Sequence, residues 1–448
     1  MILTVSAILS VALLWALIIF MMTALPRMYG DVLLLFALVF SLFYGFRALL
    51  FVLGLDGPFP ESLFWPAKDA QVLTKSALGL SLYLLLVIVA ATATTTVPSL
   101  SWGPFFVSQR PSLTRLARVT VLLTGIATLV SAALLAKYGS VGTLINAAKF
   151  DKSLAGLYVL RIFPAVGAVV ASTLVLETAP SVRRNSGLLV GGLAATLLNC
   201  LYVFMWGSRS LFVVVGALLV LGLGRKTLQF RPSSTMVWRL VLASLMVVAI
   251  AGGLRIARDT LTQGAVQDVY SQGSTWRQAS LATNSIQFDA TMLAFRDWPD
   301  VYPYRGGTDY VNGALGVIPR SVWPGKPAQV TPGAWFRQVY EPGKVNGWPM
   351  GAATLWYLNF GWAGLAFGGL LSGVVVGVIA SAQRRAPPGG WNLAVALVLV
   401  VFVFGLGWDS ETPIRMVIWL VPLWLIARYV GAAPSSSKRL QAAGAVEA

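Results

Sequence analysis

The sequence predicts an all-α integral membrane protein that crosses the bilayer about eleven times and carries one large hydrophilic loop. Of its 448 residues, 57% are hydrophobic and only 11% are charged, whereas a soluble globular protein has about a quarter of its residues charged. Apolar runs long enough to cross about 30 Å of hydrocarbon recur along the chain. One long hydrophilic stretch, from about 255 to 351, interrupts them.

The apolar stretches have the length of a transmembrane helix or approach it. They lie near 2–24, 31–54, 73–97, 118–137, 156–177, 187–206, 211–224, 239–254, 352–380, 391–408 and 412–430. The first stretch has neither a charged leader nor a small-residue cleavage site, so we expect a retained helix. The chain then divides into about eight N-terminal spans (1–254), the large loop (255–351), about three C-terminal spans (352–430) and a tail (431–448).

Basic residues fall on alternate connections between the predicted spans. These connections carry Arg27, Arg110, Arg115, Arg118, Arg183, Arg184, Arg225, Lys226, Arg231, Arg239, Arg384, Arg385, Lys438 and Arg439. The opposite connections carry most of the acids, including Asp56, Glu61, Asp69, Asp151, Asp409 and Glu411. Because short cytoplasmic loops are enriched in Lys and Arg, we expect the N-terminus and the large loop outside and the C-terminus inside.

Composition also excludes several kinds of site. The net charge of +17 would suggest nucleic acid in a soluble chain, but in a membrane chain it reflects loops and anionic head groups, so we expect no nucleic-acid partner. The chain has no histidine, which removes the commonest general base and metal ligand. Its single cysteine, Cys200, cannot form an intramolecular disulfide. We expect neither a cofactor nor a metal site.

The large loop is predicted to fold. It holds seven acids, nine basic residues and many aromatics, which is not the composition of a disordered segment. Prolines and glycines cluster at the ends of its short segments, as in PDVYPYRGG and EPGKVNGWPMG. We therefore expect a compact cap of short helices and turns that lies on the membrane.

Arg209 is the clearest charged residue within the predicted spans. It lies in the hairpin MWGSRS, and the helix expected at 211–224 rises only about 21 Å at 1.5 Å per residue. That length is below the hydrocarbon thickness, so Arg209 should be drawn below the outer membrane boundary. Because charge within the bilayer is costly, Arg209 is a candidate functional residue.

Three further arginines are expected at similar depth. Arg47 lies near the outer end of the second span, Arg161 near the outer start of the fifth, and Arg415 follows two acids in GWDSETPIR. For Arg47 and Arg161, snorkelling to the interface or internal pairing is the alternative to function. For Arg415, the alternative is pairing with Asp409 or Glu411.

A cationic chamber at the outer face would suit a phosphorylated lipid. The planar guanidinium fork binds phosphate oxygens bidentately, and a lipid diphosphate lies at head-group depth. The large loop adds Trp, Tyr and Phe side chains on which sugar rings can stack. An interfacial anchoring belt is the alternative explanation of these aromatics.

Three segments resemble one family. The segment 316–327, GVIPRSVWPGKP, looks like the signature in the large periplasmic loop of bacterial oligosaccharide repeat-unit polymerases, the O-antigen polymerase (Wzy) class. The run 351–364, GAATLWYLNFGWAG, is similar to that family's entry into the next helix. The hairpin GSRS at 207–210 resembles the G-S-R element that these polymerases share with O-antigen ligases. Those ligases depend on a loop histidine, which this chain lacks.

The resemblance implies a metal-independent glycosyltransferase of the helical glycosyltransferase-C type, without a cofactor. Such an enzyme joins undecaprenyl-diphosphate-linked oligosaccharide units, which serve as donor and acceptor, at the outer face of the bacterial inner membrane. The product would be an O-antigen, capsular polysaccharide or exopolysaccharide. Membrane lipids, a chain-length regulator and a flippase are the further partners it suggests.

Within this interpretation, cations stabilise the leaving diphosphate and a carboxylate activates the acceptor hydroxyl. The catalytic candidates are Arg209, Arg320, Asp289 and Glu341, with Asp268 as a further candidate base. The substrate-binding candidates are Arg47, Arg161, Arg277, Lys326, Arg337, Trp323 and Arg415. For Arg320, the alternative is a salt bridge that holds the loop closed.

Two other classes remain open. Another lipid-linked-sugar glycosyltransferase, or an O-antigen ligase-like enzyme, is one; monosaccharide-using enzymes usually place a catalytic acid in the first outer loop, where Asp56, Glu61 and Asp69 lie. A membrane transporter is the other. It would favour broken helices at the membrane midplane and internal repeats, whereas the charges here are expected near the outer face.

Overall fold

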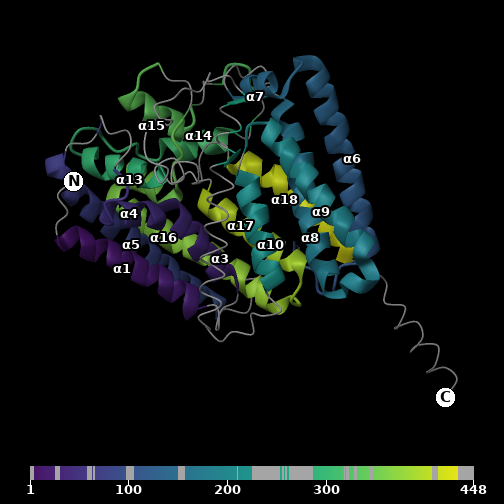
Figure 1. Ribbon diagram of the computed structural model, residues 1–448. Helices are drawn as coiled ribbons and strands as arrows, with labels where there is room; N and C mark the ends of the chain where they lie inside the picture. The colour runs from purple at the N-terminus through teal and green to yellow at the C-terminus, as the bar shows by residue number, and fades with distance from the viewer. Residues whose placement is uncertain are drawn as a thin grey trace.

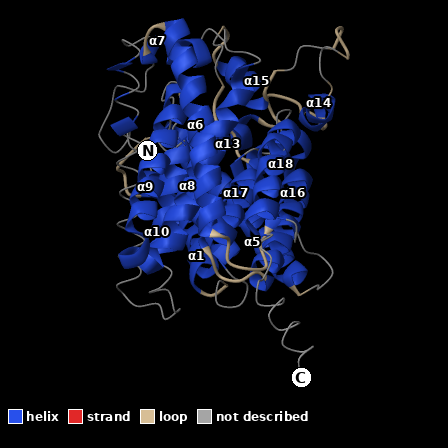
Figure 2. Cartoon of the chain, turned by 90° about the vertical axis from the view of Figure 1, so that its right-hand side faces the viewer, coloured by secondary structure: helices blue, strands red, loops and turns tan. Residues whose placement is uncertain are grey.

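The computed structural model describes most of the chain. The described residues are 5–25, 31–57, 63, 66–96, 105–149, 157–208, 210–224, 253–254, 257, 260–261, 286–316, 318, 322–326, 330–343, 347–405 and 412–431. Within these ranges every regular element is a helix and there is no strand (Figure 2). The predicted all-α class is confirmed.

Seven helical segments in the described part are long and apolar enough to cross a membrane. They comprise α1 (Val5–Thr23), the continuous run of α3 (Asp31–Phe40), η1 (Ser41–Gly45) and α4 (Phe46–Val52), then α5 (Pro66–Thr95), α6 (Leu113–Tyr138), η4 (Leu157–Arg161) with α8 (Ile162–Thr178), α9 (Val182–Met205) and α16 (Ala352–Arg385). Shorter helices are α10 (Ser210–Gly224), α17 (Gly390–Gly405) and α18 (Thr412–Gly431). The protein is therefore a polytopic membrane protein.

Each predicted span overlaps one of these helices, with one exception. The span near 239–254 lies almost wholly outside the described residues. The agreement has a simple cause, because in hydrocarbon a chain can satisfy its backbone hydrogen bonds within a single segment only as a helix. The total of eleven spans stays a prediction.

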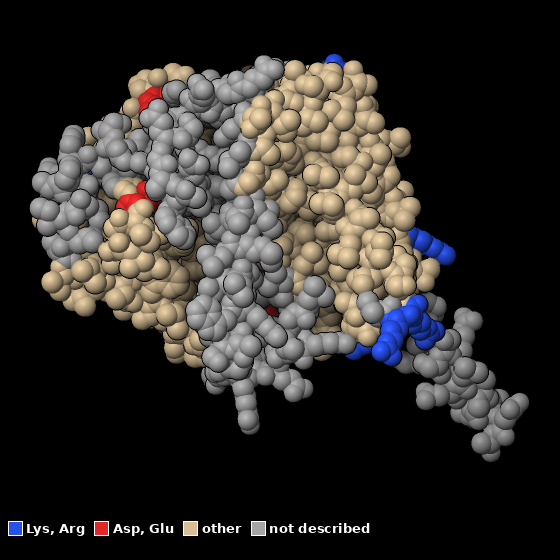
Figure 3. Space-filling view, viewed as in Figure 1, with Lys and Arg blue, Asp and Glu red and all other residues tan. Residues whose placement is uncertain are grey.

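Contacts between helix ends define one end of the bundle, which we call the basic end. Arg115 near the start of α6 donates to the carbonyl of Tyr429 near the end of α18 (2.8 Å). Gln383 of α16 reaches Asp31 at the start of α3 (3.4 Å), and Glu177 of α8 accepts the backbone N–H groups that open α17. The helix ends and connections at the basic end carry the described arginines Arg110, Arg115, Arg118, Arg183, Arg184, Arg384, Arg385 and Arg428. On the face in Figure 3, most of the visible Lys and Arg lie toward this end.

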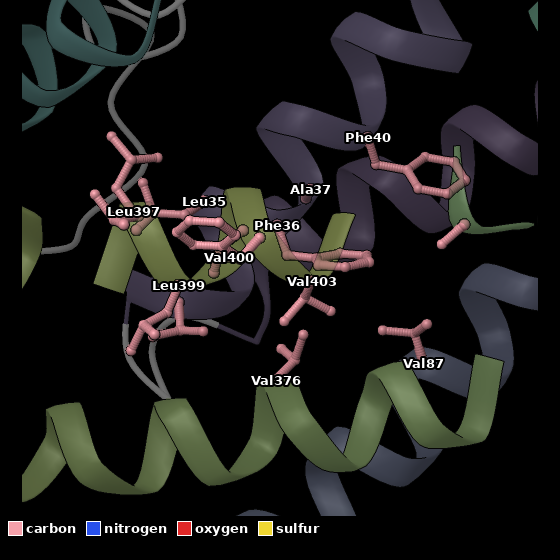
Figure 4. Close-up of a cluster of buried hydrophobic side chains, with 14 of the residues drawn as sticks. Leu35, Phe36, Ala37, Phe40, Val87, Val376, Leu397, Leu399, Val400 and Val403 are labelled. Atoms are coloured by element: carbon pink, nitrogen blue, oxygen red, sulfur yellow. The ribbon is translucent and has the colours of Figure 1, made fainter. Parts of the chain in front are cut away.

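The central helices pack closely because small residues face one another. Along α16, Gly369, Gly373 and Gly377 lie four residues apart, and a Cβ at each would come within 2.6 to 2.9 Å of a carbonyl oxygen of α5. Small residues at this spacing let two membrane helices approach closely. Beside this contact, aliphatic and aromatic side chains of α3, α5, α16 and α17 form the core (Figure 4).

Three short helices, which we call the cap helices, lie at the opposite end, the cap end. They are α13 (Ile286–Asp297), α14 (Thr308–Gly316) and α15 (Pro332–Tyr340), at the upper left of Figure 1. The first of them is almost completely buried, and its Phe295 stacks on Tyr357 of α16 with ring centroids 3.9 Å apart. Lys75 of α5 donates to the Phe295 carbonyl (2.7 Å). The large loop thus contains short helices that pack on the bundle.

Candidate functional site

Arg47 is fully buried near the cap end of the second span, so it does not snorkel in this structure. The π-helical turn η1 ends two residues before it, and such turns inside α-helices are frequent at functional sites. Trp15 of α1 donates to the backbone carbonyl of Gly45 (3.1 Å) in this turn. The irregular turn therefore has a partner on the neighbouring helix.

The Arg47 guanidinium lies between two buried carboxylates. Its Nε and Nη2 donate to the two oxygens of Asp289 in α13, at 2.7 and 3.2 Å. Its Nη1 donates to Asp56, and its Nη2 also donates to the carbonyl of Gly57 (2.9 Å). The guanidinium additionally lies 4.7 Å from the centre of the Phe51 ring. This cluster, Arg47, Asp56 and Asp289, joins the second span to the first cap helix.

A second ion pair lies at the C-terminal end of α13. Arg296 donates to both oxygens of Asp297, at 2.6 and 2.8 Å, and Tyr340 of α15 donates its hydroxyl to the same carboxylate (2.5 Å). Burial alone would lower the pKa of Arg296, but the hydrogen bond and charge of Asp297 outweigh it and the pKa is raised. Burial, and then Asp297, raise the pKa of Tyr340. This contact joins α13 to α15.

A third pair connects the cap helices to α16. Arg305 donates through Nε and Nη2 to the two oxygens of Asp309, both at 2.7 Å, and its guanidinium lies 3.7 Å from the ring centre of Trp335. Asn359 of α16 donates to Asp309 (2.9 Å) and accepts from the backbone N–H of Gly307 (3.1 Å). The amide therefore fastens the turn before α14 to the membrane helix.

The backbone of α16 breaks just beyond Asn359. Gly361 has φ +64° and ψ −146°, a conformation open essentially only to glycine. A Cβ at Gly361 would also come within 2.7 Å of the Tyr304 ring. Because 24 residues, 362–385, follow the break in α16, it lies near the cap end rather than in the middle of the helix.

Other predicted site residues are also paired. Arg337 of α15 donates to Glu341 (2.5 Å), four residues further on. Lys326 donates to the carbonyl of Ile318 (3.0 Å), while the Trp323 side chain is exposed. The two candidate bases, Asp289 and Glu341, are thus each engaged by an arginine.

Arg161 contacts the hairpin MWGSRS that the sequence singles out. Arg161 is the last residue of η4, and it donates to the Ser208 hydroxyl (2.8 Å) in the tight connection between α9 and α10. Gly207 in this connection has φ +72°. Since α8 ends and α9 begins at the basic end, this connection lies at the cap end. The residue after Ser208 is Arg209.

Several predicted site residues lie outside the described part. Arg209, Arg277, Arg320 and Asp268 are not described, nor is the side chain of Arg415 or the pair Asp409 and Glu411. Among the described residues no group of three or more Asp, Glu, His or Cys could hold a metal ion. Arg47, Arg161 and the start of α16 are brought to one end of the bundle.

Sequence reasoning missed the residues that fasten the cap helices, namely Asp297, Arg305, Asp309 and Asn359. A signal existed for one pair, because Arg305 and Asp309 have the four-residue spacing of a helical ion pair. Asn359 lies inside the run 351–364, but nothing in that run indicates which segment its amide contacts.

Comparison with known proteins adds no assignment. No family model, no curated protein and no solved structure matches the chain. The fold and the site define a helical membrane protein with a charged end that short helices cover.

Proposed function

We propose that this protein is a polysaccharide polymerase that joins lipid-diphosphate-linked oligosaccharide repeat units. In this proposal, undecaprenyl diphosphate carries both the growing chain, which is the donor, and the new unit, which is the acceptor. The bond from the growing chain to its diphosphate breaks as a hydroxyl of the new unit attacks, so the diphosphate leaves with the electron pair. The hydroxyl proton passes to a base.

The proposal rests on two segments that lie at the same end of the helix bundle. Gly207 and Ser208 of the hairpin and the motif-bearing start of α16 are distant in sequence, yet both lie at the end of the bundle that bears the cap helices. An enzyme acting on a lipid-linked sugar needs cations at head-group depth and a surface above them for the sugar. This arrangement supports such a site at the cap end.

The proposal includes the orientation of the protein and the membrane in which it lies. We infer that the cap end faces the periplasm, because most described arginines of the short connections lie at the basic end. The protein would then lie in the bacterial inner membrane, with about eleven spans, a periplasmic N-terminus, a cytoplasmic C-terminus and the helical glycosyltransferase-C type of fold. The product would be an O-antigen, capsular polysaccharide or exopolysaccharide.

Arg209 and Arg320 are the proposed cations for the leaving diphosphate. The roles of the candidate bases differ in support. Asp289 is buried in a cluster with Arg47, whereas Glu341 is partly exposed and bound by a single arginine. Glu341 is therefore the better placed of the two to meet a substrate hydroxyl.

The transporter alternative has less support. Its substrate site would need discontinuous helices near the midplane, but the break at Gly361 lies near the cap end of α16. The buried charges described above also lie at the cap end rather than midway along the bundle.

The test is chain extension by the purified protein. Lipid-linked repeat units are incubated with wild type, with Arg209→Lys and with the matched control Arg183→Lys from the basic end. Losing the bidentate fork should slow extension about a hundredfold for Arg209→Lys, while Arg183→Lys should match wild type. Polymer formed at the wild-type rate by a well-folded Arg209→Lys would refute the role of Arg209, and no polymer from wild type would refute the function.

A further inference from the structure

A groove with a mostly apolar lining lies between α1, α5 and α16. Its volume is about 330 Å³, and its lining residues are Ser6, Gln71, Thr74, Lys75, Leu78 and Trp362. Four of them follow a spacing of three and four residues along α5, so they share one face of that helix. Leu78 and Trp362 are 44% and 42% exposed although they belong to membrane-spanning helices. The groove therefore opens toward the lipid.

Lys75 places a positive charge in this groove. It lies inside the membrane-spanning stretch Ala70–Thr95, where an ionisable side chain is costly unless it is paired or reaches polar surroundings. Its Nζ donates to the carbonyl of Phe295 (2.7 Å), and no carboxylate whose side chain the structure describes forms an ion pair with it. An ammonium group has three N–H donors. A neutral carbonyl uses one donor and leaves the charge without a counter-ion among the described side chains.

A neutral amide lies beside the charge. Gln71 lies one turn before Lys75 on the same face of α5, and its side chain is exposed. The Thr74 hydroxyl donates to the carbonyl of Ala70 (2.8 Å) and lies 3.4 Å from the Ser6 hydroxyl, so these two groups bond within the protein. A single cation beside an amide matches a ligand that has one negative charge and several acceptor oxygens.

We propose that this groove binds the phosphate head group of an anionic phospholipid. The phosphodiester would accept hydrogen bonds from Lys75 and Gln71, and an acyl chain would lie along Leu78 and Trp362. The charge decides between lipids, because a phosphodiester carries one negative charge and a diphosphate carries more than a single lysine neutralises. This lipid site is separate from the polymerase proposal and does not depend on it.

The experiment uses the full chain, purified in detergent and stripped of lipid. Retention of phosphatidylglycerol and of zwitterionic phosphatidylcholine is measured by native mass spectrometry, and the melting temperature is followed during lipid titration. Wild type should retain phosphatidylglycerol preferentially and should melt at a higher temperature with it. Lys75→Gln should lower phosphatidylglycerol affinity at least about tenfold, as expected on losing a charge-assisted hydrogen bond.

Two variants keep the result interpretable. Lys137→Gln removes another cap-end lysine, on α6 and outside the groove, and should leave lipid affinity unchanged. Because Lys75 also holds Phe295, Lys75→Gln alone could loosen α13. Gln71→Leu keeps that bond and should still weaken phosphatidylglycerol binding several-fold, with an unchanged melting temperature in the absence of lipid.

Four results of the lipid-binding experiments would overturn the proposal. These are equal retention of the two phospholipids by wild type, equal loss in the Lys75 and Lys137 variants, unchanged affinity in Gln71→Leu, and displacement of phosphatidylglycerol by equimolar undecaprenyl diphosphate. Inorganic phosphate should not compete at millimolar concentration, since it has no acyl chain. Competition by inorganic phosphate would show an anion site without lipid specificity and would also contradict the proposal.

Discussion

Replacing Arg47 should damage the protein more than replacing either of its acidic partners. Among the described residues, the buried cluster holds one positive and two negative charges, Arg47 with Asp56 and Asp289, whose side chains are at most 1% exposed. Asp289→Asn keeps the ion pair of Arg47 with Asp56. Arg47→Met removes the arginine from two buried carboxylates, which is the more costly change.

The size of each effect depends on the hydrogen bonds and ion pairs that the substitution removes. Asp289→Asn removes the charge from two hydrogen bonds of 2.7 and 3.2 Å, at a cost of about 2 kcal/mol. Arg47→Met breaks both ion pairs, and removing one partner of a buried pair typically costs about 3 to 5 kcal/mol. This approaches the whole stability of many folded domains, about 5 to 15 kcal/mol.

The assay is the melting temperature of each purified variant, followed by its expression level. The expected order of melting temperature is wild type, then Asp289→Asn and Asp56→Asn, then Arg47→Met. Arg183→Met, an exposed arginine at the basic end, is the matched control and should melt like wild type. Equal melting temperatures for Arg47→Met and Asp289→Asn would refute the charge argument.

The same variants separate a structural role of Asp289 from a catalytic one. If the carboxylate only anchors α13, chain extension by Asp289→Asn should fall in step with its melting temperature. If Asp289 were the general base, extension should fall far more than the loss of melting temperature explains. From the bidentate contact with Arg47 we expect the first result.

Three further predictions address other parts of the account. Gly361→Ala should destabilise the protein by at least about 1 to 3 kcal/mol, because Gly361 has φ +64° and faces the Tyr304 ring. Gly191→Ala is the control and should be neutral or stabilising, since a Cβ at Gly191 would have no neighbouring atom within 4 Å. Equal melting temperatures of the two variants would contradict this prediction. Chain extension should continue in excess EDTA, and activity lost to EDTA and restored by a divalent ion would contradict the metal-independent mechanism. In a Cys200→Ser background, a cysteine at Ser274 should react with an impermeant maleimide in whole cells and one at Ser112 should not; the reverse pattern would invert the proposed topology.

The helices were predictable because the bilayer imposes a length and an apolar composition on every span. The ends of α16 and α18 match the hydropathy limits within a few residues, and α5 begins earlier than predicted because its first turns are polar. The cap helices were anticipated from the Pro and Gly spacing, but their boundaries were not.

The pairing of the charges was not predictable. Arg47 and Asp289 lie 242 residues apart, and an isolated sequence contains no signal that couples them. The same holds for Asn359 and Asp309, which are 50 residues apart. Depth could be inferred for Arg161 from its place at a span end, but its contact with Ser208 depends on how α8 and α9 pack.

The most direct test of the proposed function is the lipid-linked sugar that accumulates in cells lacking this protein. The polymerase proposal predicts that single repeat units on undecaprenyl diphosphate accumulate outside the inner membrane and that long polymer disappears. Wild-type protein and Arg183→Lys should restore the polymer, and Arg209→Lys should not. Accumulation of incomplete units on the cytoplasmic side, or polymer of normal length without the protein, would contradict the proposal.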